Sequence, residues 1–562
     1  MKIPNVWGQG QIFAFSALDG KTSRKNDLVG VLAGDRVGIR FNTKVRRELA
    51  VSGNGAIAID FSAVCGDYIC AETVTGCIKL LFYSSRTIIG EVPEGAVVSV
   101  FTEGKYKTEY IDDVEIQDTE DGEYTALLIQ GKKFAFSYAR KKDEAVLLAK
   151  GGIIADVDKE EEKKIAYYKK YSNAKSYELL YSKCLSVMKT QLFSPEEIFT
   201  SIWSTPDRVP HRDLWLWDSV FHAIGFRNVD GKLAESLILS MLESKQPDGR
   251  IPCRTTITED GIIFSPEETQ PPVIAWGAWK VYEKTKNKEF LNKVFEENKE
   301  FLSWCMGNRK YSDGLYAWWV DESQPFCRCG ESGMDNSPRF DETKHLLAVD
   351  FSCFMANEMR YMAKISEELG KDGSVYLDEF DAVKNAINEK LWDEESGFYY
   401  DFDADRNKIN KVKTVVTFLP FFAGVCDKEK AEKLIFHLTN PEEFYSEFPV
   451  PSVSKDDSTY GTDMWRGPVW INYNYMISEG LNEYGYKELS EEIKRKTVSV
   501  VEEWYEKNGT IYEFYDSENE KAPSKLSRKG KAVEPYDLRG RIQSIRDYGW
   551  SCCLTLDIIE NL

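Results

Sequence analysis

Hydrophobic residues follow two different periods along this 562-residue chain, and the change lies near residue 170. Residues 10–155 hold short runs rich in β-branched and aromatic residues, separated by Gly, Asp, Asn and Lys turns, which predict an antiparallel β-sandwich. The charged stretch 158–164 is expected to be a linker or the start of a connecting helix. Beyond it the period becomes 3.6, which is typical of helices. We therefore predict an N-terminal β-sandwich domain with its linker over 1–170 and a helical domain over 171–562. The predicted strands include residues 29–32, 37–41, 56–60, 78–83, 97–101, 124–129 and 134–138.

The joints between the predicted helices alternate between short and long. Twelve helices are expected, at 175–191, 217–227, 231–245, 271–286, 288–308, 345–369, 376–392, 414–424, 427–439, 466–484, 486–508 and 547–561. In a ring of antiparallel helix pairs, this alternation places every long loop on the same face. An all-α (α/α)6 barrel is therefore the predicted architecture, and its mouth is the expected place for function. A helical solenoid is the alternative, but its self-similar repeat is not visible. The long joints are 192–216, 246–270, 309–344, 393–413, 440–465 and 509–546.

Composition excludes several classes of function. The formal net charge of −20 argues against a nucleic acid or an anionic membrane surface as partner. No apolar run reaches about 18 residues, and no secretory signal is visible, so a cytoplasmic location is expected. Twelve scattered cysteines and four histidines leave no complete zinc set and few histidine bases. We expect neither a metal nor a cofactor.

Aromatic residues gather on the long joints beside carboxylate, amide and guanidinium groups. Examples are Trp217-Asp218-Ser219, Gln270 before a Pro-Pro pair, and Trp465-Arg-Gly-Pro-Val-Trp470. Aromatic faces stack on sugar rings, and planar polar groups bind vicinal hydroxyls, so this composition is typical of a sugar site. Each motif alone also fits a structural role, such as a helix cap with a core tryptophan. Their joint placement on five of the six long joints favours a carbohydrate site.

These motifs resemble those of the inverting α-glycosidases of glycoside hydrolase family 63, and they are similar to those of the related trehalases. The resemblance covers roughly residues 205–562 and rests on six motifs in the family's order. It implies that Asp335, in Glu331-Ser-Gly-Met-Asp335, is the general acid, and that Glu513, in Tyr512-Glu513-Phe-Tyr-Asp516, is the general base. It also implies a set of substrate-binding residues: Trp217, Asp218, Gln270, Trp318, Asn336, Arg339, Trp465, Arg466, Gly467, Trp470 and Trp550.

The sequence departs from the family pattern at two places. Met464 stands where an aromatic residue usually precedes the Trp-Arg-Gly-Pro motif. The stretch from Asp516 to Tyr548 looks longer and more basic than usual, and its role does not transfer from the family. Its basic residues are Lys521, Lys525, Arg528, Lys529 and Lys531.

We therefore predict an exo-acting inverting α-glycosidase that removes a terminal α-linked glucose, or mannose, from a small glycoside or oligosaccharide. Asp335 is expected beside Trp318 or Trp319, and Glu513 in a wetter setting that keeps it ionised. Two alternatives are a sugar isomerase or epimerase, for which His211 and His222 are the available bases, and a carbohydrate-binding protein without activity. Glucose release from an α-glucoside would distinguish the first alternative from a hydrolase.

Overall fold

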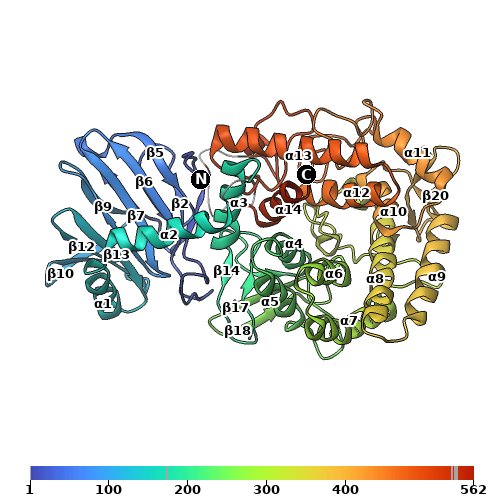
Figure 1. Ribbon diagram of the computed structural model, residues 1–562, viewed down its shortest axis with the longest axis horizontal. Coiled ribbons are helices and arrows are strands. Elements are labelled where there is room, and N and C mark those ends of the chain that lie inside the picture. Colours follow the sequence, from blue (N-terminus) through green and yellow to red (C-terminus); the bar gives the residue numbers. More distant parts are fainter. Residues whose placement is uncertain (1, 173–174, 533–535, 537–541) are drawn as a thin grey trace.

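The computed structural model describes residues 2–172, 175–532, 536 and 542–562. Antiparallel sheets form its N-terminal part and helices its C-terminal part, as the change of period predicts (Figure 1). One sheet has the strand order β1-β2-β3-β4-β9 and the other β10-β11-β12-β13-β8-β7-β6-β5. The strands are β1 (Ile12–Ala14), β2 (Val29–Leu32), β3 (Gly38–Phe41), β4 (Arg47–Ser52), β5 (Ala58–Val64), β6 (Tyr68–Thr73), β7 (Gly76–Ser84), β8 (Thr87–Glu91), β9 (Val97–Thr102), β10 (Lys107–Ile111), β11 (Val114–Asp118), β12 (Tyr124–Gln130) and β13 (Lys133–Ala139).

The two sheets share one hydrophobic cluster. Phe13 and Phe41 of the first sheet meet Phe82 and Phe136 of the second, with ring centroids 4.9 and 5.2 Å apart. Helix α1 (Lys142–Ile153) covers the other face of the larger sheet and was not predicted. The charged stretch after it forms α2 (Val157–Tyr171), the helix that was one of the two alternatives expected there. The predicted boundary at residue 170 stays a prediction.

The helical part contains the twelve expected helices, most of them within a few residues of the predicted bounds. The helix expected at 414–424 is shorter, because residues 415–418 form a 3-10 turn before α10. The helices are α3 (Glu178–Thr190), α4 (Leu216–Phe226), α5 (Gly231–Leu242), α6 (Ile274–Thr285), α7 (Lys288–Asn308), α8 (Val349–Glu368), α9 (Ser374–Lys390), α10 (Leu419–Ala423), α11 (Lys428–Leu438), α12 (Ile471–Glu483), α13 (Lys487–Asn508) and α14 (Gly549–Glu560).

Short strands lie in the joints between the helices. They form pairs or triplets that stiffen these joints. They are β14 (Leu192–Phe193), β15 (Trp203–Ser204), β16 (Leu214–Trp215), β17 (Arg254–Thr258), β18 (Gly261–Phe264), β19 (Leu346–Leu347), β20 (Trp392–Asp393), β21 (Phe398–Tyr399), β22 (Asp401–Asp403) and β23 (Lys408–Asn410).

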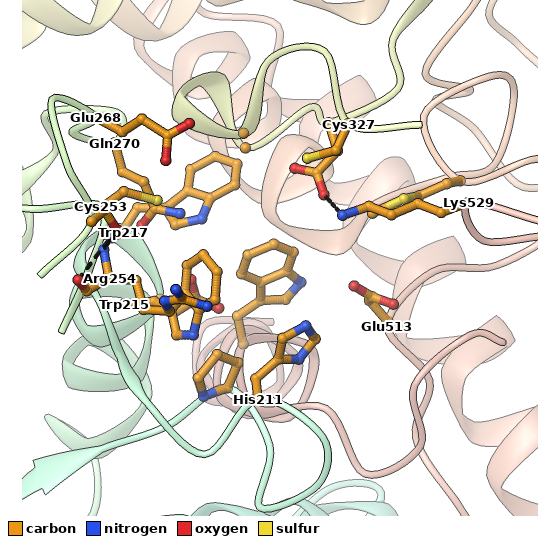
Figure 2. A pocket seen from close by; sticks show the side chains of 18 of the residues that line it. His211, Trp215, Trp217, Cys253, Arg254, Glu268, Gln270, Cys327, Glu513 and Lys529 are labelled. Carbon is orange, nitrogen blue, oxygen red and sulfur yellow. Dashed lines mark hydrogen bonds and ion pairs between the residues drawn. The ribbon is translucent and has the colours of Figure 1, made fainter. Parts of the chain in front are cut away.

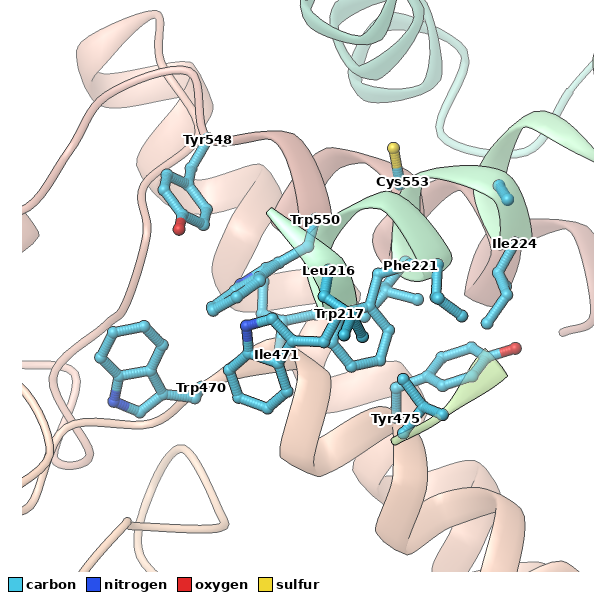
Figure 3. Close-up of a cluster of buried hydrophobic side chains, with 14 of the residues drawn as sticks. Leu216, Trp217, Phe221, Ile224, Trp470, Ile471, Tyr475, Tyr548, Trp550 and Cys553 are labelled. Carbon is cyan, nitrogen blue, oxygen red and sulfur yellow. The ribbon is translucent and has the colours of Figure 1, made fainter. Parts of the chain in front are cut away.

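Six helices form a closed series of contacts. Helix α4 packs on α6, α6 on α8, α8 on α10, α10 on α12, α12 on α14, and α14 again on α4. Every residue of α4 is buried, as expected for a helix that is apolar nearly all round. Aromatic side chains fill the space between α4, α12 and α14, with Trp217 and Phe221 packed edge-on against Trp550 (Figure 3). The amphipathic α5, α7, α9 and α13 lie outside this ring against α4, α6, α8 and α12.

A buried carboxyl joins two helices of the ring. Glu358 of α8 accepts hydrogen bonds from Ala275 N at 2.8 Å and Trp276 N at 3.2 Å, in the first turn of α6, and from Asn298 Nδ2 at 2.8 Å. Burial raises the pKa of Glu358 to about 7, although these hydrogen bonds lower it. Because this pKa exceeds the ordinary value of 4.5, its contribution to stability is complete below pH 4.5 and is lost as the pH rises through about 7.

Glu358→Gln should remove this dependence on pH. The free energy of unfolding of the native protein, minus that of the variant, should fall by about 3 kcal/mol between pH 4 and pH 8. Denaturant unfolding at several pH values measures it, and Glu367→Gln, at a position of the same helix away from this contact, is the matched control. A difference that does not change with pH would contradict the prediction.

No helix within the described ranges has both the length and the apolar character needed to cross a membrane.

Candidate active site

A cavity of about 260 Å³ opens where the N-terminal ends of several ring helices meet. Trp217 and Asp218 lie in the first turn of α4, Gln270 precedes α6, Trp470 immediately precedes α12, and Trp550 lies in the first turn of α14. Five of the six long joints contribute lining residues; the joint at 393–413 does not. The long loops that line the cavity therefore share one face of the ring, as predicted.

Asp335 and Glu513 line this cavity from two different joints. Figure 2 shows Glu513 and Lys529 on one side and Glu268, Gln270 and Trp217 on the other. A hydrogen bond fixes this second side, because Trp217 N donates to Gln270 Oε1 at 3.2 Å. The two carboxylates predicted to carry the chemistry thus face one enclosed space.

The Asp335 loop lies directly on Trp217. Gly333, two residues before Asp335, has φ +72°, and a Cβ there would lie 2.2 Å from the Trp217 ring. A few residues earlier, the buried Glu331 carboxylate accepts hydrogen bonds from Thr269 N at 2.9 Å and Trp319 N at 2.7 Å. Arg309 also pairs with Glu331, at 2.8 Å. This network fixes the backbone that carries Asp335.

Glu513 is buried, with a side chain only 3% exposed, and is not in the wetter setting we expected. Arg528 binds both of its oxygens, with Nε–Oε2 at 2.7 Å and Nη2–Oε1 at 3.1 Å. Burial opposes the charge on Arg528, but the Glu513 carboxylate more than offsets it and raises the pKa of the guanidinium. A bidentate ion pair with Arg528, rather than water, surrounds the Glu513 carboxylate.

Asp335 pairs with Lys529, the residue after Arg528. The aromatic residues expected beside it lie elsewhere: Trp318 and Trp319 line a separate hollow. Trp318 donates to Asp350 Oδ1 at 2.8 Å and stacks on Phe351 at 3.8 Å. Neither Trp318 nor Trp319 therefore lines the cavity with Asp335: Trp318 packs on α8, and Trp319 is 48% exposed.

Burial is the main influence on the pKa of the Asp218 carboxyl. This residue lines the cavity, and Tyr548 Oη donates to its Oδ1 at 3.4 Å. Burial raises its pKa well above the usual range, and the charges of Asp207 and Glu513 raise it further. A carboxyl in this state can both donate and accept hydrogen bonds with sugar hydroxyls.

Seven of the residues predicted for the site line the cavity, and six do not. Those that line it are Trp217, Asp218, Gln270, Asp335, Trp470, Glu513 and Trp550. Trp318, Asn336, Arg339, Trp465, Arg466 and Gly467 lie outside its lining.

These six support the loops around the cavity. Trp465 stacks flat on Trp470 at 3.8 Å, and Asn336 Oδ1 accepts from Trp465 N at 3.0 Å. Arg466 pairs with Asp341. At Gly467, φ is +118° and a Cβ would lie 2.0 Å from Gly461 O, so the close approach of two chain segments requires glycine.

Arg339 is also a buried support. It is 1% exposed and pairs with Asp350 at 2.6 Å and Asp401 at 3.3 Å.

Several lining residues were not predicted as site residues. Arg528 and Lys529 were visible only as part of a basic stretch, and Tyr548 and Met464 only as parts of motifs. The larger side chains in this group are those of His211, Trp215, Cys253, Arg254, Glu268, Cys327, Met464, Arg528, Lys529 and Tyr548. The charge of a side chain does not by itself predict that it lines the cavity, because the residues that meet there are distant in the sequence.

A possible metal-ligating group lies far from this chemistry. Among the described residues, Cys70, Glu72 and Cys77 bring three ligand atoms within 4.8 Å of one another. They lie on β6 and β7 of the N-terminal sheet and do not line the cavity.

Comparison with known proteins identifies the family. A sequence model described as a mannosylglycerate hydrolase MGH1-like glycoside hydrolase domain matches residues 210–551. The chain belongs to glycoside hydrolase family 63. It is therefore an enzyme of the glycoside hydrolase type. The match includes the joints that carry Asp335 and Glu513.

Individual relatives agree with the family. Mannosylglycerate hydrolase MGH1 of Selaginella moellendorffii is 25% identical over 378 residues, which are 54% of this chain and 75% of that protein. The solved GH63 mannosylglycerate hydrolase from Thermus thermophilus, in complex with Tris, has a TM-score of 0.55 at 23% identity and covers 67% of this chain and 99% of its own. A bacterial glucoamylase complexed with acarbose has a TM-score of 0.59 at 12% identity over 99% of this chain and 95% of its own. The last two likenesses concern the fold alone.

Proposed function

We propose that this enzyme is an exo-acting inverting α-glycosidase that removes a terminal α-linked mannose or glucose from a small glycoside. The observation that carries the proposal is the single cavity lined by both Asp335 and Glu513, in a chain of family 63. We further propose that the closed series of helices is the inner ring of an (α/α)6 barrel, with the cavity at its mouth. The contacts that return from α14 to α4 support this architecture.

In the proposed mechanism, Glu513 activates a water that attacks the anomeric carbon. Its bidentate contact with Arg528 supports this role, because it fixes the position of the Glu513 carboxylate at the cavity. Asp335 gives a proton to the leaving oxygen from the opposite face of the sugar. The rings of Trp217, Trp470 and Trp550 provide apolar surface for the sugar, and Asp218 and Gln270 provide polar contacts.

The size of the cavity favours a small substrate. About 260 Å³ lies near the lower limit of ligand cavities and suits one sugar ring with a small aglycone. The relatives described as mannosylglycerate hydrolases support mannose, which the prediction from the sequence allowed beside glucose.

The isomerase alternative has less support, because its histidine pair does not meet in the cavity. His211 lines the cavity and pairs with Asp207 Oδ2 at 2.5 Å. His222 lies in the core beside Ser204, and burial lowers its pKa to about 3. A binding protein without activity would need neither the paired Glu513 nor Asp335.

The stereochemistry of the product tests the proposal. On hydrolysis of α-glucosyl and α-mannosyl glycosides, NMR should detect the β-anomer of the free sugar first, before mutarotation, because water attacks opposite the leaving group. The α-anomer first would mean retention and would exclude Glu513 as a base. Conversion of a free reducing sugar without hydrolysis would support the isomerase instead.

A further inference from the structure

Two cysteines and a glutamate meet on one face of the larger N-terminal sheet. Cys70 and Glu72 lie on β6 and Cys77 on β7, and the strand register pairs Glu72 with Cys77. Cys70 lies on the same face, because side chains two positions apart on a strand point the same way. One ligand atom from each of the three residues lies within 4.8 Å of the other two. Figure 1 shows β6 and β7 side by side, away from the ring of helices.

The hairpin between β6 and β7 fixes this arrangement. The ladder reaches the turn without a shift of register, and its last pair is Thr73 with Gly76. Thr73 Oγ1 donates to Gly76 O at 2.6 Å, which closes the turn. The backbone therefore sets the positions of the three side chains, and rotation of the side chains alone can bring their ligand atoms onto one ion.

The group is accessible from the side of the turn. Cys70 is 4% exposed, Cys77 is half-buried and Glu72 is exposed. Val74, at the tip of the hairpin, is 84% exposed. Cysteine is among the most buried residue types, and an exposed one is usually kept for its chemistry. One ligand is thus held in the fold, and the other two lie where an ion can enter without opening the sheet.

Negative charge gathers beside this group. Asp60 of β5 lies opposite Glu72 in the register, and like charges in such a cross-strand pair destabilise the sheet. The ammonium of Lys79, two positions after Cys77, is bound by Asp158 at 2.8 Å and Glu161 at 2.5 Å. A cation beside Glu72 would therefore offset a repulsion that Lys79 does not relieve.

The types of ligand indicate the class of metal. Thiolates are soft ligands that Zn²⁺ binds well and that Mg²⁺ and Ca²⁺ bind poorly. Zn²⁺ holds sulfur at about 2.3 Å and carboxylate oxygen at about 2.1 Å, so the ligand atoms of a tetrahedral site lie about 3.5–3.8 Å apart. Cys77 Sγ already donates to Glu72 Oε1 at 3.9 Å. Two thiolates and one carboxylate also supply more negative charge than a divalent cation needs.

A disulfide is the competing use of the two cysteines. Cys70 lies opposite Lys79 and Cys77 opposite Glu72, so the cysteines occupy diagonal positions of the ladder. Diagonal positions are typically about 7–8 Å apart, beyond the separation of about 4.4–6.8 Å that a disulfide spans. A metal ion bridges such a pair without movement of the backbone. It also gives the Glu72 carboxylate a role, which a disulfide does not.

We propose that Cys70, Glu72 and Cys77 form a binding site for one thiophilic divalent cation of the Zn²⁺ class. Two thiolates and one carboxylate hold the ion, and water completes its coordination. Binding displaces the thiol protons to solvent and changes no oxidation state. The role of the ion is structural: it joins β6 to β7 beside the ion pairs through which Lys79 ties α2 to the sheet.

This site is independent of the proposed glycosidase. Its three residues do not line the cavity that holds Asp335 and Glu513. The proposal therefore departs from our expectation of no metal only for the N-terminal sheet, and every readout of its test is something other than activity.

Metal titration of the full chain tests the site. The protein is reduced with a phosphine and freed of metal with a chelator, which is then removed. Calorimetry should show one strong Zn²⁺ site per chain that excess Mg²⁺ does not block, and Co²⁺ should give thiolate-to-metal charge-transfer absorption. Cys77→Ser should weaken Zn²⁺ binding at least about 100-fold and Glu72→Gln about 10-fold, since even changes around the ligands of a metal cost about 10–100-fold.

The matched control is Cys327→Ser. Cys327 is the other half-buried cysteine among the residues that the structure describes, and it lies far from β6 and β7. This variant should bind Zn²⁺ and Co²⁺ as the native protein does. Glu72 is exposed, so Glu72→Gln keeps the test decisive even if Cys77→Ser fails to fold.

Hydrogen exchange locates the bound ion. Zn²⁺ should slow the exchange of amides in β6 and β7 of the native protein and of Cys327→Ser, because the ion holds the two strands together. In Cys77→Ser the same amides should exchange at one rate with and without Zn²⁺.

Three results would overturn the proposal. The first is equal Zn²⁺ binding by the native protein, Cys77→Ser and Glu72→Gln. The second is displacement of Zn²⁺ by Mg²⁺ without charge-transfer absorption from Co²⁺, which would mean carboxylate binding alone. The third is a disulfide between Cys70 and Cys77 in the protein isolated without reductant, together with no Zn²⁺ binding after reduction.

Discussion

Glu513→Gln should lower kcat on unactivated α-glycosides by about 10³-fold or more, because the attacking water loses its base. Asp335→Asn should cause a similar loss on the same substrates. The two variants should differ on an α-glycosyl fluoride, since fluoride leaves with little protonation. That substrate should restore part of the rate of Asp335→Asn and none of the rate of Glu513→Gln. Steady-state kinetics with both substrates measure the difference.

A control variant is needed because Glu513 forms a buried ion pair with Arg528. Glu513→Gln leaves the charge of Arg528 buried beside a neutral amide, which destabilises the protein. The double variant Glu513→Gln/Arg528→Gln removes both charges and should recover part of this stability. It should remain inactive. If activity returned with stability, Glu513 would be a structural residue and not the base.

Arg339→Met should destabilise the protein by about 3–5 kcal/mol, because it leaves buried carboxylates without their cation. The guanidinium is fully buried between Asp350 and Asp401. Burial raises the pKa of Asp401 to about 6 even though Arg339 lowers it. Removal of Arg339 should raise this pKa further, so the loss of stability should shrink as the pH falls from 7 toward 5. Denaturant unfolding at both pH values measures it.

The same variant decides between two roles for Arg339. As a substrate contact, its loss would raise KM and leave the free energy of unfolding nearly unchanged. Arg406→Met, a substitution of an arginine whose side chain is 46% exposed and which also pairs with acidic residues, is the matched control and should have a small effect. A stable Arg339→Met protein with weak substrate binding would contradict the structural role.

The sequence predicts the architecture well because its signals are local. The change of hydrophobic period marks where sheets give way to helices, and the alternating joints place Asp335 and Glu513 on loops of one face. Helix α1 was missed, although its buried residues have helical spacing, because strand-like runs precede it. The 3-10 turn before α10 also depends on local packing that the hydrophobic pattern does not show.

The finer assignment of the site depends on contacts that no local pattern reveals. An arginine or tryptophan beside a catalytic loop suits a sugar contact or a buried support equally well, and Arg339, Trp318 and Trp465 are supports in this fold. The partner of Arg528 lies 15 positions away and is reached only after the chain turns back on the cavity. Lys529 and Asp335 are far apart in sequence, so only the fold shows that they meet.

The buried carboxylate of Asp547 links the N-terminal strand to the wall of the cavity. Its oxygens accept hydrogen bonds from Ile12 N at 2.8 Å and Thr510 Oγ1 at 2.9 Å and pair with Lys183 at 2.7 Å. Tyr548 and Trp550, which line the cavity, follow immediately. The two regions are therefore not interchangeable modules: grafting the helices onto another protein without β1 would take a hydrogen-bond donor from the carboxylate that precedes the aromatic residues of the cavity wall.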